Sequence, residues 1–381
     1  MLKVAIVGCG KIADSHASQI RRIEGCEIVG VCDREELMAK QFCQRFRIKR
    51  HFSGLDELLS DVRPDVVHVT TPPGSHFEIA EHCLRRQAHV YVEKPFTLNT
   101  RDAEELIELA QQKGLKITAG HDDQFRHAAR RLRQMVQDGY LGGAPVHMES
   151  YYCYDMGVSS AYSKALLGDK EHWVRKLPGR LLHNIISHGI ARIAEFLGTE
   201  NPRVFAHGFV SPALRKTGEE EIVDELRVII SGDDRVTAFF TFSSQMRPSL
   251  HQFRIYGPSN GLLLDQDNET LIRLEGKRYK SYLEHFVSPL VLAKQYVGNT
   301  AQNVRAFLAN DFHMKSGMKY LVEAFYRSIT DGKPLPIPYR EILLTSRIMD
   351  SIFEQIAAKR WPPGFEPAAA SRPIDSRLTS A

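Results

Sequence analysis

Residues 2–13 read LKVAIVGCGKIA, and this stretch decides the fold of the first half of the chain. The apolar run Val4 to Val7 is typical of a buried strand, and the glycines and the small Ala13 that follow form a GxGxxA turn that opens a helix. In such a turn the first glycine permits a tight bend, and the second lets backbone N–H groups approach a pyrophosphate at the helix N-terminus. The pattern predicts a dinucleotide site. The predicted cofactor contacts at this turn are Gly8, Gly10, Lys11 and Ile12.

A second predicted strand, Glu27 to Cys32, ends at Asp33, about twenty residues past the glycine turn. An acidic residue at this place accepts hydrogen bonds from the adenosine ribose hydroxyls and repels a 2′-phosphate, so NAD is the expected cofactor. Arg34 could turn toward a 2′-phosphate, which keeps NADP as the alternative.

Alternating predicted strands and helices continue to about Gly120. The strand over 65–70 leads into Thr71-Pro72-Pro73-Gly74, and the strand over 89–92 leads into Glu93-Lys94-Pro95. Ligands of open α/β sheets lie at the carboxyl ends of strands, so both loops are predicted to line the cofactor site. The further predicted cofactor contacts are Thr71, Pro72, His76, Glu93 and Lys94.

Three side chains near these strand ends have alternative interpretations. His76 either lines the cofactor or is solvated in a first helical turn, whereas His16 is expected to pack on the sheet. Lys94 would sit on an apolar strand tip, where partial desolvation lowers the pKa of an ammonium toward the range useful for proton transfer. A plain surface lysine is the alternative.

Composition predicts a two-domain globular protein. The chain has 381 residues, of which 43% are hydrophobic and 25% charged, and its formal net charge is +4 without a concentrated basic run, so nucleic acid is not the expected partner. No apolar run approaches a membrane span, and a strand that starts at Leu2 leaves no room for a signal peptide, so we expect a cytoplasmic protein. The six cysteines lack a CxxC pair and are expected to be reduced and buried.

The sequence of the second half of the chain predicts a sheet and a helix with a polar face. Long alternating runs at 146–154, 203–210, 222–231, 235–243 and 251–256 are typical of antiparallel strands. In the predicted helix after Pro178-Gly179, Asn184, His188 and Arg192 recur every four residues and therefore share one face, which indicates a polar cleft. A helix is also predicted over 124–137, with Arg126, Arg130, Arg131 and Arg133 on a solvated face rather than at a phosphate site.

The three motifs of the first half, GxGxxA, TPxxxH (71–76) and EKP (93–95), together resemble the Gfo/Idh/MocA family of oxidoreductases. The resemblance extends from Leu2 to about Trp361. It implies an α/β protein with a Rossmann NAD(P)-binding domain over 1–121. It also implies an α/β domain over 122–365, whose open, largely antiparallel sheet supports the substrate site and an oligomer interface. Residues 366–381 are rich in Pro, Ala and Ser and are expected to form a mobile tail.

The resemblance implies an NAD(P)-dependent oxidoreductase that transfers hydride between a nicotinamide and a secondary alcohol of a sugar, a nucleotide-sugar or a cyclitol. It further implies a homo-oligomer, either a dimer or a tetramer. The catalytic residues it implies are Lys94, His188 and Asn184. The substrate contacts it implies are Lys94, Asn184 and His188, and the charge of Arg192 on the same helix face makes it a fourth predicted contact. Two alternatives stay open: a regulator that binds nucleotide without turnover, and an enzyme that uses NAD transiently to eliminate or hydrolyse a glycoside.

The chain departs from the family motif DxxxHxxxD at both aspartates. Asn184 replaces the first and cannot neutralise Lys94, and Arg192 replaces the last with a fixed positive charge. Together with Arg175, Lys176 and Arg180, Arg192 favours an anionic substrate, with a solvated basic loop as the alternative.

Two further stretches complete the predictions. No metal is expected at His121-Asp122-Asp123, because adjacent residues rarely converge on one ion without distant partners. A short helix over 288–297 is predicted to cover the cleft or an oligomer contact, followed by helices over 314–330 and from about Tyr339 to Lys359.

Overall fold

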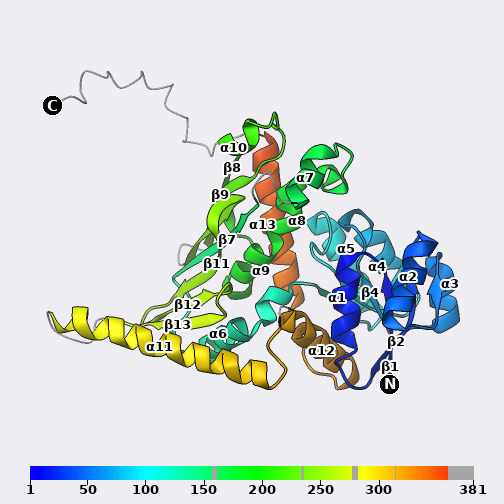
Figure 1. The fold of residues 1–381 in the computed structure, drawn as a ribbon, viewed down its shortest axis with the longest axis horizontal. Helices are drawn as coiled ribbons and strands as arrows, with labels where there is room; N and C mark the ends of the chain where they lie inside the picture. Colours follow the sequence, from blue (N-terminus) through cyan, green and yellow to red (C-terminus); the bar gives the residue numbers. More distant parts are fainter. Residues whose placement is uncertain (157–160, 233–235, 277–281, 314, 359–381) are drawn as a thin grey trace.

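The first half of the computed structural model is a parallel sheet (Figure 1). The structure describes residues 1–358 apart from 157–160, 233–235, 277–281 and 314. Within these residues the first sheet has six strands in the order β3-β2-β1-β4-β5-β6, all paired in parallel. The strand order reverses between β1 and β4, which is where such sheets bind ligands. The strands are β1 (Leu2–Val7), β2 (Cys26–Cys32), β3 (His51–Phe52), β4 (Val66–Val69), β5 (His89–Val92) and β6 (Ile117–Ala119).

Helices connect these strands and bury their apolar faces on the sheet. Asn99 caps α5 by accepting a hydrogen bond from the backbone N–H of Asp102, whereas α1 begins after Gly10 without a side-chain cap. The predicted strands and helices of this half are confirmed, and β3 and α3 are additional. The helices are α1 (Lys11–Ile20), α2 (Glu36–Phe46), α3 (Leu55–Val62), α4 (His76–Arg85) and α5 (Thr100–Gln112), with a 3₁₀ turn η1 (Pro73–Ser75).

One helix from the end of the chain packs into the core of the first half. Figure 1 shows α12 (Ser316–Thr330) beside α1. Its apolar positions Met318, Leu321, Val322 and Phe325 follow helical spacing and are all buried in the first core. The division of the chain at residue 121 stays a prediction, but the first core extends past it.

The second half is built on a mixed sheet that is largely antiparallel, as predicted. Within the described residues it has seven strands in the order β13-β12-β11-β7-β10-β9-β8, and only the pairing of β10 with β7 is parallel. Helices α9 and α13 pack against one face of it (Figure 1). The strands are β7 (His147–Asp155), β8 (Arg203–Phe209), β9 (Glu225–Gly232), β10 (Val236–Ser243), β11 (Gln245–Tyr256), β12 (Gly261–Asp265) and β13 (Thr270–Leu274).

The helices of the second half differ from the predictions in two places. The stretch over 261–312 holds β12, β13 and a helix of 26 residues, so the predicted short helix over 288–297 was too short. The helix predicted after Pro178-Gly179 is divided at Ile186 into α8 and α9. The helices are α6 (His127–Gln137), α7 (Ala161–Gly168), α8 (Arg180–Ile185), α9 (Ser187–Phe196), α10 (Pro212–Arg215), α11 (Leu283–Leu308) and α13 (Tyr339–Ala358), with 3₁₀ turns η2 (Asp122–Phe125) and η3 (Trp173–Lys176).

The arginines of α6, and Arg126 just before it, do not form a solvated face, so that prediction was wrong. Arg126 forms an ion pair with Glu269, and Arg133 forms one with Glu195. The guanidinium of Arg130 lies 3.4 Å from the ring centroid of Tyr320. Sequence periodicity placed these residues outside the apolar stripe, but the partners come from distant segments that periodicity does not reveal.

The cysteines are free thiols, and all except the partly buried Cys26 are buried, as expected. Burial raises the pKa of Cys9 and Cys83 to about 12, so both stay neutral thiols at neutral pH. Of the helices in the described ranges, none has both the length and the apolar character that a membrane crossing requires. The predicted tail over 366–381 lies outside the described residues.

Candidate active site

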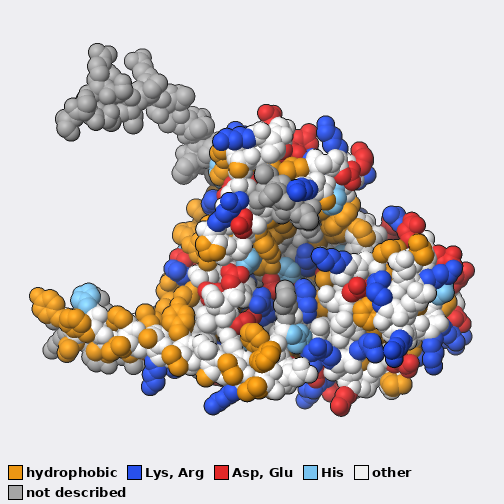
Figure 2. All heavy atoms as spheres, in the orientation of Figure 1, with side chains coloured by type: hydrophobic (Ala, Val, Ile, Leu, Met, Phe, Trp, Pro, Cys, Tyr) orange, Lys and Arg blue, Asp and Glu red, His pale blue; other side chains and the backbone are white. Residues whose placement is uncertain are grey.

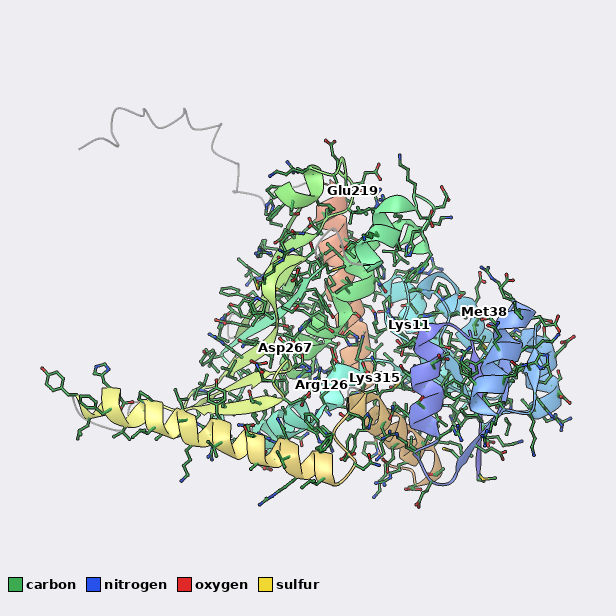
Figure 3. All side chains as sticks on the ribbon, in the orientation of Figure 1. Lys11, Met38, Arg126, Glu219, Asp267 and Lys315 are labelled. Carbon is green, nitrogen blue, oxygen red and sulfur yellow. The ribbon has the colours of Figure 1, made fainter. Side chains whose placement is uncertain are left out.

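The glycine turn brings the ends of β1 and β4 close together. Gly8 has φ +95°, and a Cβ at this residue would lie 2.8 Å from the backbone nitrogen of Thr71, so only glycine fits. A Cβ at Gly10 would meet open space, and the first turn of α1 has no side-chain cap. Figure 3 shows Lys11 at this end of α1, on the side that faces the second half. The uncapped helix start can therefore receive an anion.

Asp33 lies directly beside the glycine turn. Its Oδ2 accepts a hydrogen bond from the backbone N–H of Cys9 (2.7 Å), and its Oδ1 accepts one from the N–H of Glu35 (2.9 Å). These two bonds fix the carboxylate and leave each oxygen a further lone pair for a ribose hydroxyl. Arg34 is exposed on the same loop.

The loop after β4 is supported from beneath by His76. This histidine is fully buried, with Nε2 2.9 Å from the carbonyl of Thr71 and Nδ1 2.9 Å from the carbonyl of Pro95. Burial lowers the pKa of His76, so the neutral ring donates to one carbonyl at a time. It is neither solvated nor exposed to a cofactor, and it joins the loops that carry Thr71 and Lys94.

The end of β5 places two charged side chains at the sheet edge. The Nζ of Lys94 donates a hydrogen bond to the backbone carbonyl of Asn184 (2.8 Å), which connects the two halves. Burial lowers the pKa of Lys94, while the carboxylates of Glu93, Asp122 and Asp123 oppose this shift. The negative neighbours of the lysine therefore come from β5 and η2 rather than from the position where the family motif has its first aspartate.

A chain of buried polar side chains runs from Glu93 into the core. His16 Nε2 donates to Glu93 Oε1 (2.7 Å), the Nδ1 atoms of His16 and His68 lie 2.8 Å apart, and His68 Nε2 lies 2.8 Å from the hydroxyl of Tyr326. Burial would raise the pKa of Glu93, but the hydrogen bond and charge of His16 outweigh it and lower the pKa to about 2. His16 therefore packs, as predicted, and also holds an ionised carboxylate.

The helix pair α8 and α9 brings His188 to the site and keeps Arg192 underneath it. His188 is partly buried, and burial lowers its pKa to about 4 although the charge of Asp123 opposes this. Arg192 is only 3% exposed and donates a hydrogen bond to the carbonyl of Asp123 (2.8 Å). Arg192 thus supports the η2 turn in this structure, and its predicted contact with substrate would be indirect.

Sequence analysis missed the carboxylate partner of His188. Asp123 Oδ2 lies 3.8 Å from His188 Nδ1 and accepts a hydrogen bond from the hydroxyl of Tyr152 (2.7 Å). Burial would raise the pKa of Asp123, but His188, Tyr152 and two arginines hold it below its usual value; burial and Asp123 instead raise the pKa of Asp122. The signal was in the sequence, because 121–123 follow β6 at the carboxyl edge of the sheet.

No metal was expected at 121–123 because these adjacent residues lacked a distant fellow ligand, but the structure places His188 beside Asp122 and Asp123. Ligand atoms of Asp122, Asp123 and His188 lie within 4.8 Å of one another. The charges of Lys94 and Lys315 also act on these side chains, which disfavours a cation there. We assign no metal to this cluster.

The basic residues of η3 and the start of α8 form ion pairs with glutamates, which does not support the expected anionic substrate. Arg175 pairs with Glu219, Lys176 with Glu171 and Arg180 with Glu221. Figure 2 shows the surface hollowed between the two halves, with Lys, Arg and His side chains around the hollow. Figure 3 shows Lys315 and Arg126 in this region.

Comparisons with known proteins identify similar chains. Residues 2–121 match the model of the Gfo/Idh/MocA oxidoreductase family, NAD-binding Rossmann fold. UDP-N-acetylglucosamine 3-dehydrogenase of Acidithiobacillus ferrooxidans is 33% identical over 39% of this chain and 44% of its own length. Myo-inositol 2-dehydrogenase of Thermotoga maritima is 21% identical over 83% of this chain and 89% of its own length. The match to the first of these relatives thus spans less than half of it.

A solved structure extends the similarity of fold over nearly the whole chain. An oxidoreductase from Agrobacterium radiobacter, in complex with NAD⁺, L-tartaric acid and magnesium, has a TM-score of 0.72 at 15% identity. The match covers 94% of this chain and 97% of that one. The first half therefore matches an NAD-binding Rossmann fold, and the second half shares the fold of this oxidoreductase.

Proposed function

We propose that this chain is an oxidoreductase of the Gfo/Idh/MocA family and that it transfers hydride between NAD and a secondary alcohol of a sugar, a nucleotide-sugar or a cyclitol. One observation carries the proposal: Lys94, His188 and Asp123 come together at the carboxyl edge of an NAD(P)-binding sheet. The sugar and cyclitol dehydrogenases among the relatives support the substrate class.

The residues around the glycine turn fit NAD. Gly10 leaves room beside the uncapped start of α1 for a pyrophosphate, and the fixed carboxylate of Asp33 is suited to ribose hydroxyls. When bound, the nicotinamide supplies the hydride chemistry. The protein side chains must then hold the alcohol and remove or return its hydroxyl proton.

We assign these two tasks to Lys94 and His188. Lys94 is held by the carbonyl of Asn184 and by nearby carboxylates, so its ammonium can stabilise negative charge on the substrate oxygen. His188 is neutral at neutral pH because burial lowers its pKa, and it can accept the hydroxyl proton. The carboxylate of Asp123 lies 3.8 Å from His188 Nδ1 without a hydrogen bond, and its negative charge stabilises the imidazolium that results.

The cofactor preference gives the first prediction. NAD should bind more tightly than NADP, because the charge of Asp33 repels a 2′-phosphate. Asp33→Asn keeps an acceptor for the N–H of Cys9 but removes the charge, so it should shift the ratio of the two dissociation constants toward NADP by about tenfold. Calorimetry with both cofactors measures this ratio, and equal or tighter binding of NADP to the unchanged protein would contradict the prediction.

The pH dependence of alcohol oxidation gives the second prediction. A base must be unprotonated to accept a proton, so with His188 as base kcat/KM should fall only as pH drops toward about 4 and should stay level through neutral pH. If neutral Lys94 were the base, kcat/KM would instead rise steadily into the alkaline range. A profile that rises in this way, with no change in slope in His188→Gln, would reverse our assignment of the two roles.

The proposed activity is tested by following nicotinamide absorbance with NAD and a panel of sugars, UDP-sugars and inositols. Reduction of NAD by at least one of them supports the proposal. Binding of NAD with no substrate-dependent change across the panel would favour a regulator. Net product formation with catalytic NAD and no net reduction would establish elimination or hydrolysis of a glycoside.

A further inference from the structure

The loop that carries Lys94 and the turn that carries Asp122 leave the first sheet side by side. Strands β5 and β6 are parallel neighbours in which Val92 is paired with Ala119, so the two chains continue from the same edge, about 4.8 Å apart. The backbone N–H of Gly120 still donates a hydrogen bond to the carbonyl of Val92 (2.8 Å), so the pairing extends past the end of β6. This register brings the η2 turn next to the lysine.

The η2 turn is held in place from its other side. A Cβ at Gly317 would overlap the carbonyl oxygen of Asp122, so a glycine is needed for the start of α12 to pack this closely. The carbonyl of Asp123 accepts hydrogen bonds from Arg192 (2.8 Å) and from Gln266 (3.2 Å). The backbone therefore fixes the direction in which the Asp122 side chain leaves the turn.

The two neighbouring carboxylates of η2 have different surroundings. Burial raises the pKa of Asp123, but groups of the second half outweigh it: His188, Tyr152, Arg126 and Arg192. Burial and the charge of Asp123 raise the pKa of Asp122 to about 7, so this carboxylate is ionised throughout the alkaline range. The other charges that act on Asp122 are those of Lys315, Glu93 and Lys94. Asp123 therefore serves the second half, whereas Asp122 acts on the end of β5.

Several titratable groups face the ammonium of Lys94. They are Glu93 before it, His121, Asp122 and Asp123 after β6, His188 on α9, and Lys315 at the start of α12 (Figure 3). Burial lowers the pKa of Lys94, and the charge that opposes this most is that of Glu93, followed by Asp122. Both oxygens of Glu93 already accept hydrogen bonds, from His16 (2.7 Å) and from the backbone N–H of Lys94 (3.2 Å). Asn184 contributes a carbonyl at 2.8 Å and no charge.

We propose that Asp122 is a positioning residue for Lys94: its carboxylate holds the lysine side chain as an ammonium. From the η2 turn it supplies the negative charge that the amide of Asn184 cannot supply. For turnover this inference rests on the proposed function, in which the ammonium stabilises negative charge on the substrate oxygen. The titration of Lys94 itself needs no substrate, so the two proposals can fail separately.

The titration of Lys94 tests the inference. Asp122→Asn should lower the pKa of Lys94 by roughly one unit, because a nearby opposite charge is lost. Carbon-13 NMR of the lysine side chains in the cofactor-free protein measures this pKa, and the signal of Lys94 is identified by its absence in Lys94→Ala. Asp138→Asn is the matched control, because Asp138 is exposed at the end of α6, and it should leave the pKa of Lys94 unchanged.

Moving the charge tests where it acts. Asn184→Asp added to Asp122→Asn should raise the pKa of Lys94 again, because the carbonyl of residue 184 lies 2.8 Å from the lysine Nζ. Once a substrate is known, the fall of kcat/KM at alkaline pH should move to lower pH in Asp122→Asn and return in the double variant. A loss of packing alone would lower kcat/KM equally at every pH.

Two outcomes would overturn the inference. One is an unchanged pKa of Lys94 in Asp122→Asn that is folded by circular dichroism and NAD binding; Asp122→Ser gives the same test if the asparagine variant does not fold. The other is an equal shift when the unchanged protein is treated with EDTA, because Asp122 would then act through a bound metal. The expected shift without oxidation of any sugar, nucleotide-sugar or inositol would instead refute the proposed function and support the inference about Asp122.

Discussion

Lys94→Ala should lower kcat by about a hundredfold or more while leaving the dissociation constant of NAD nearly unchanged. The loss is large because the ammonium is held at the carboxyl end of β5, 2.8 Å from the carbonyl of Asn184, where it can meet the substrate oxygen. NAD affinity should persist because the glycine turn and Asp33 hold the dinucleotide at the ends of other strands. Stopped-flow measurement of nicotinamide reduction and calorimetry of NAD binding separate the two effects.

Lys315→Ala provides the control for this experiment. Lys315 also acts electrostatically on Lys94 and lowers its pKa, so its removal tests whether any positive charge near the site suffices. We expect only a small change in kcat and a raised pKa for Lys94, because a like charge has been removed. If Lys94→Ala kept full turnover, the lysine would be structural, and the negative charge on the substrate oxygen would not depend on its ammonium.

His16→Leu should destabilise the protein by about 3–5 kcal/mol, because it leaves the buried carboxylate of Glu93 without its donor. The double variant His16→Leu/Glu93→Leu should recover part of this loss, since a buried pair replaced by apolar groups costs far less than a broken pair. Thermal unfolding of the cofactor-free protein measures both. Losses that simply add in the double variant would show that the two side chains do not act as a pair.

The pair of Glu93 and His16 should also make the free energy of unfolding depend on pH in the acid range. The pKa of Glu93 falls from 4.5 to about 2 on folding, so its contribution of about 3 kcal/mol is present above about pH 4.5 and is lost as pH falls toward 2. In His16→Leu this part of the pH dependence should shrink or reverse, because burial alone raises the pKa of a carboxyl group. Urea unfolding at several pH values between these limits measures the slope.

The sequence predicted the features that depend on neighbours along the chain. The glycine turn, Asp33 and the strands that lead to Thr71 and Lys94 were predictable because strand and helix periods and turn chemistry are local properties. Helical spacing predicted one shared face for Asn184, His188 and Arg192, but Asn184 lies on α8 and the other two lie on α9, so no single helix carries all three.

Tertiary structure alone decided which side chains are partners. Asp123 lies near His188 because the turn after β6 packs against the start of α9. Arg192 donates a hydrogen bond to the backbone of that turn and is buried beneath it. The buried partnership of Glu93 with His16 likewise joins the end of β5 to helix α1, which are far apart in sequence. Charge and burial at a site depend on such through-space neighbours, and a one-dimensional pattern carries no record of them.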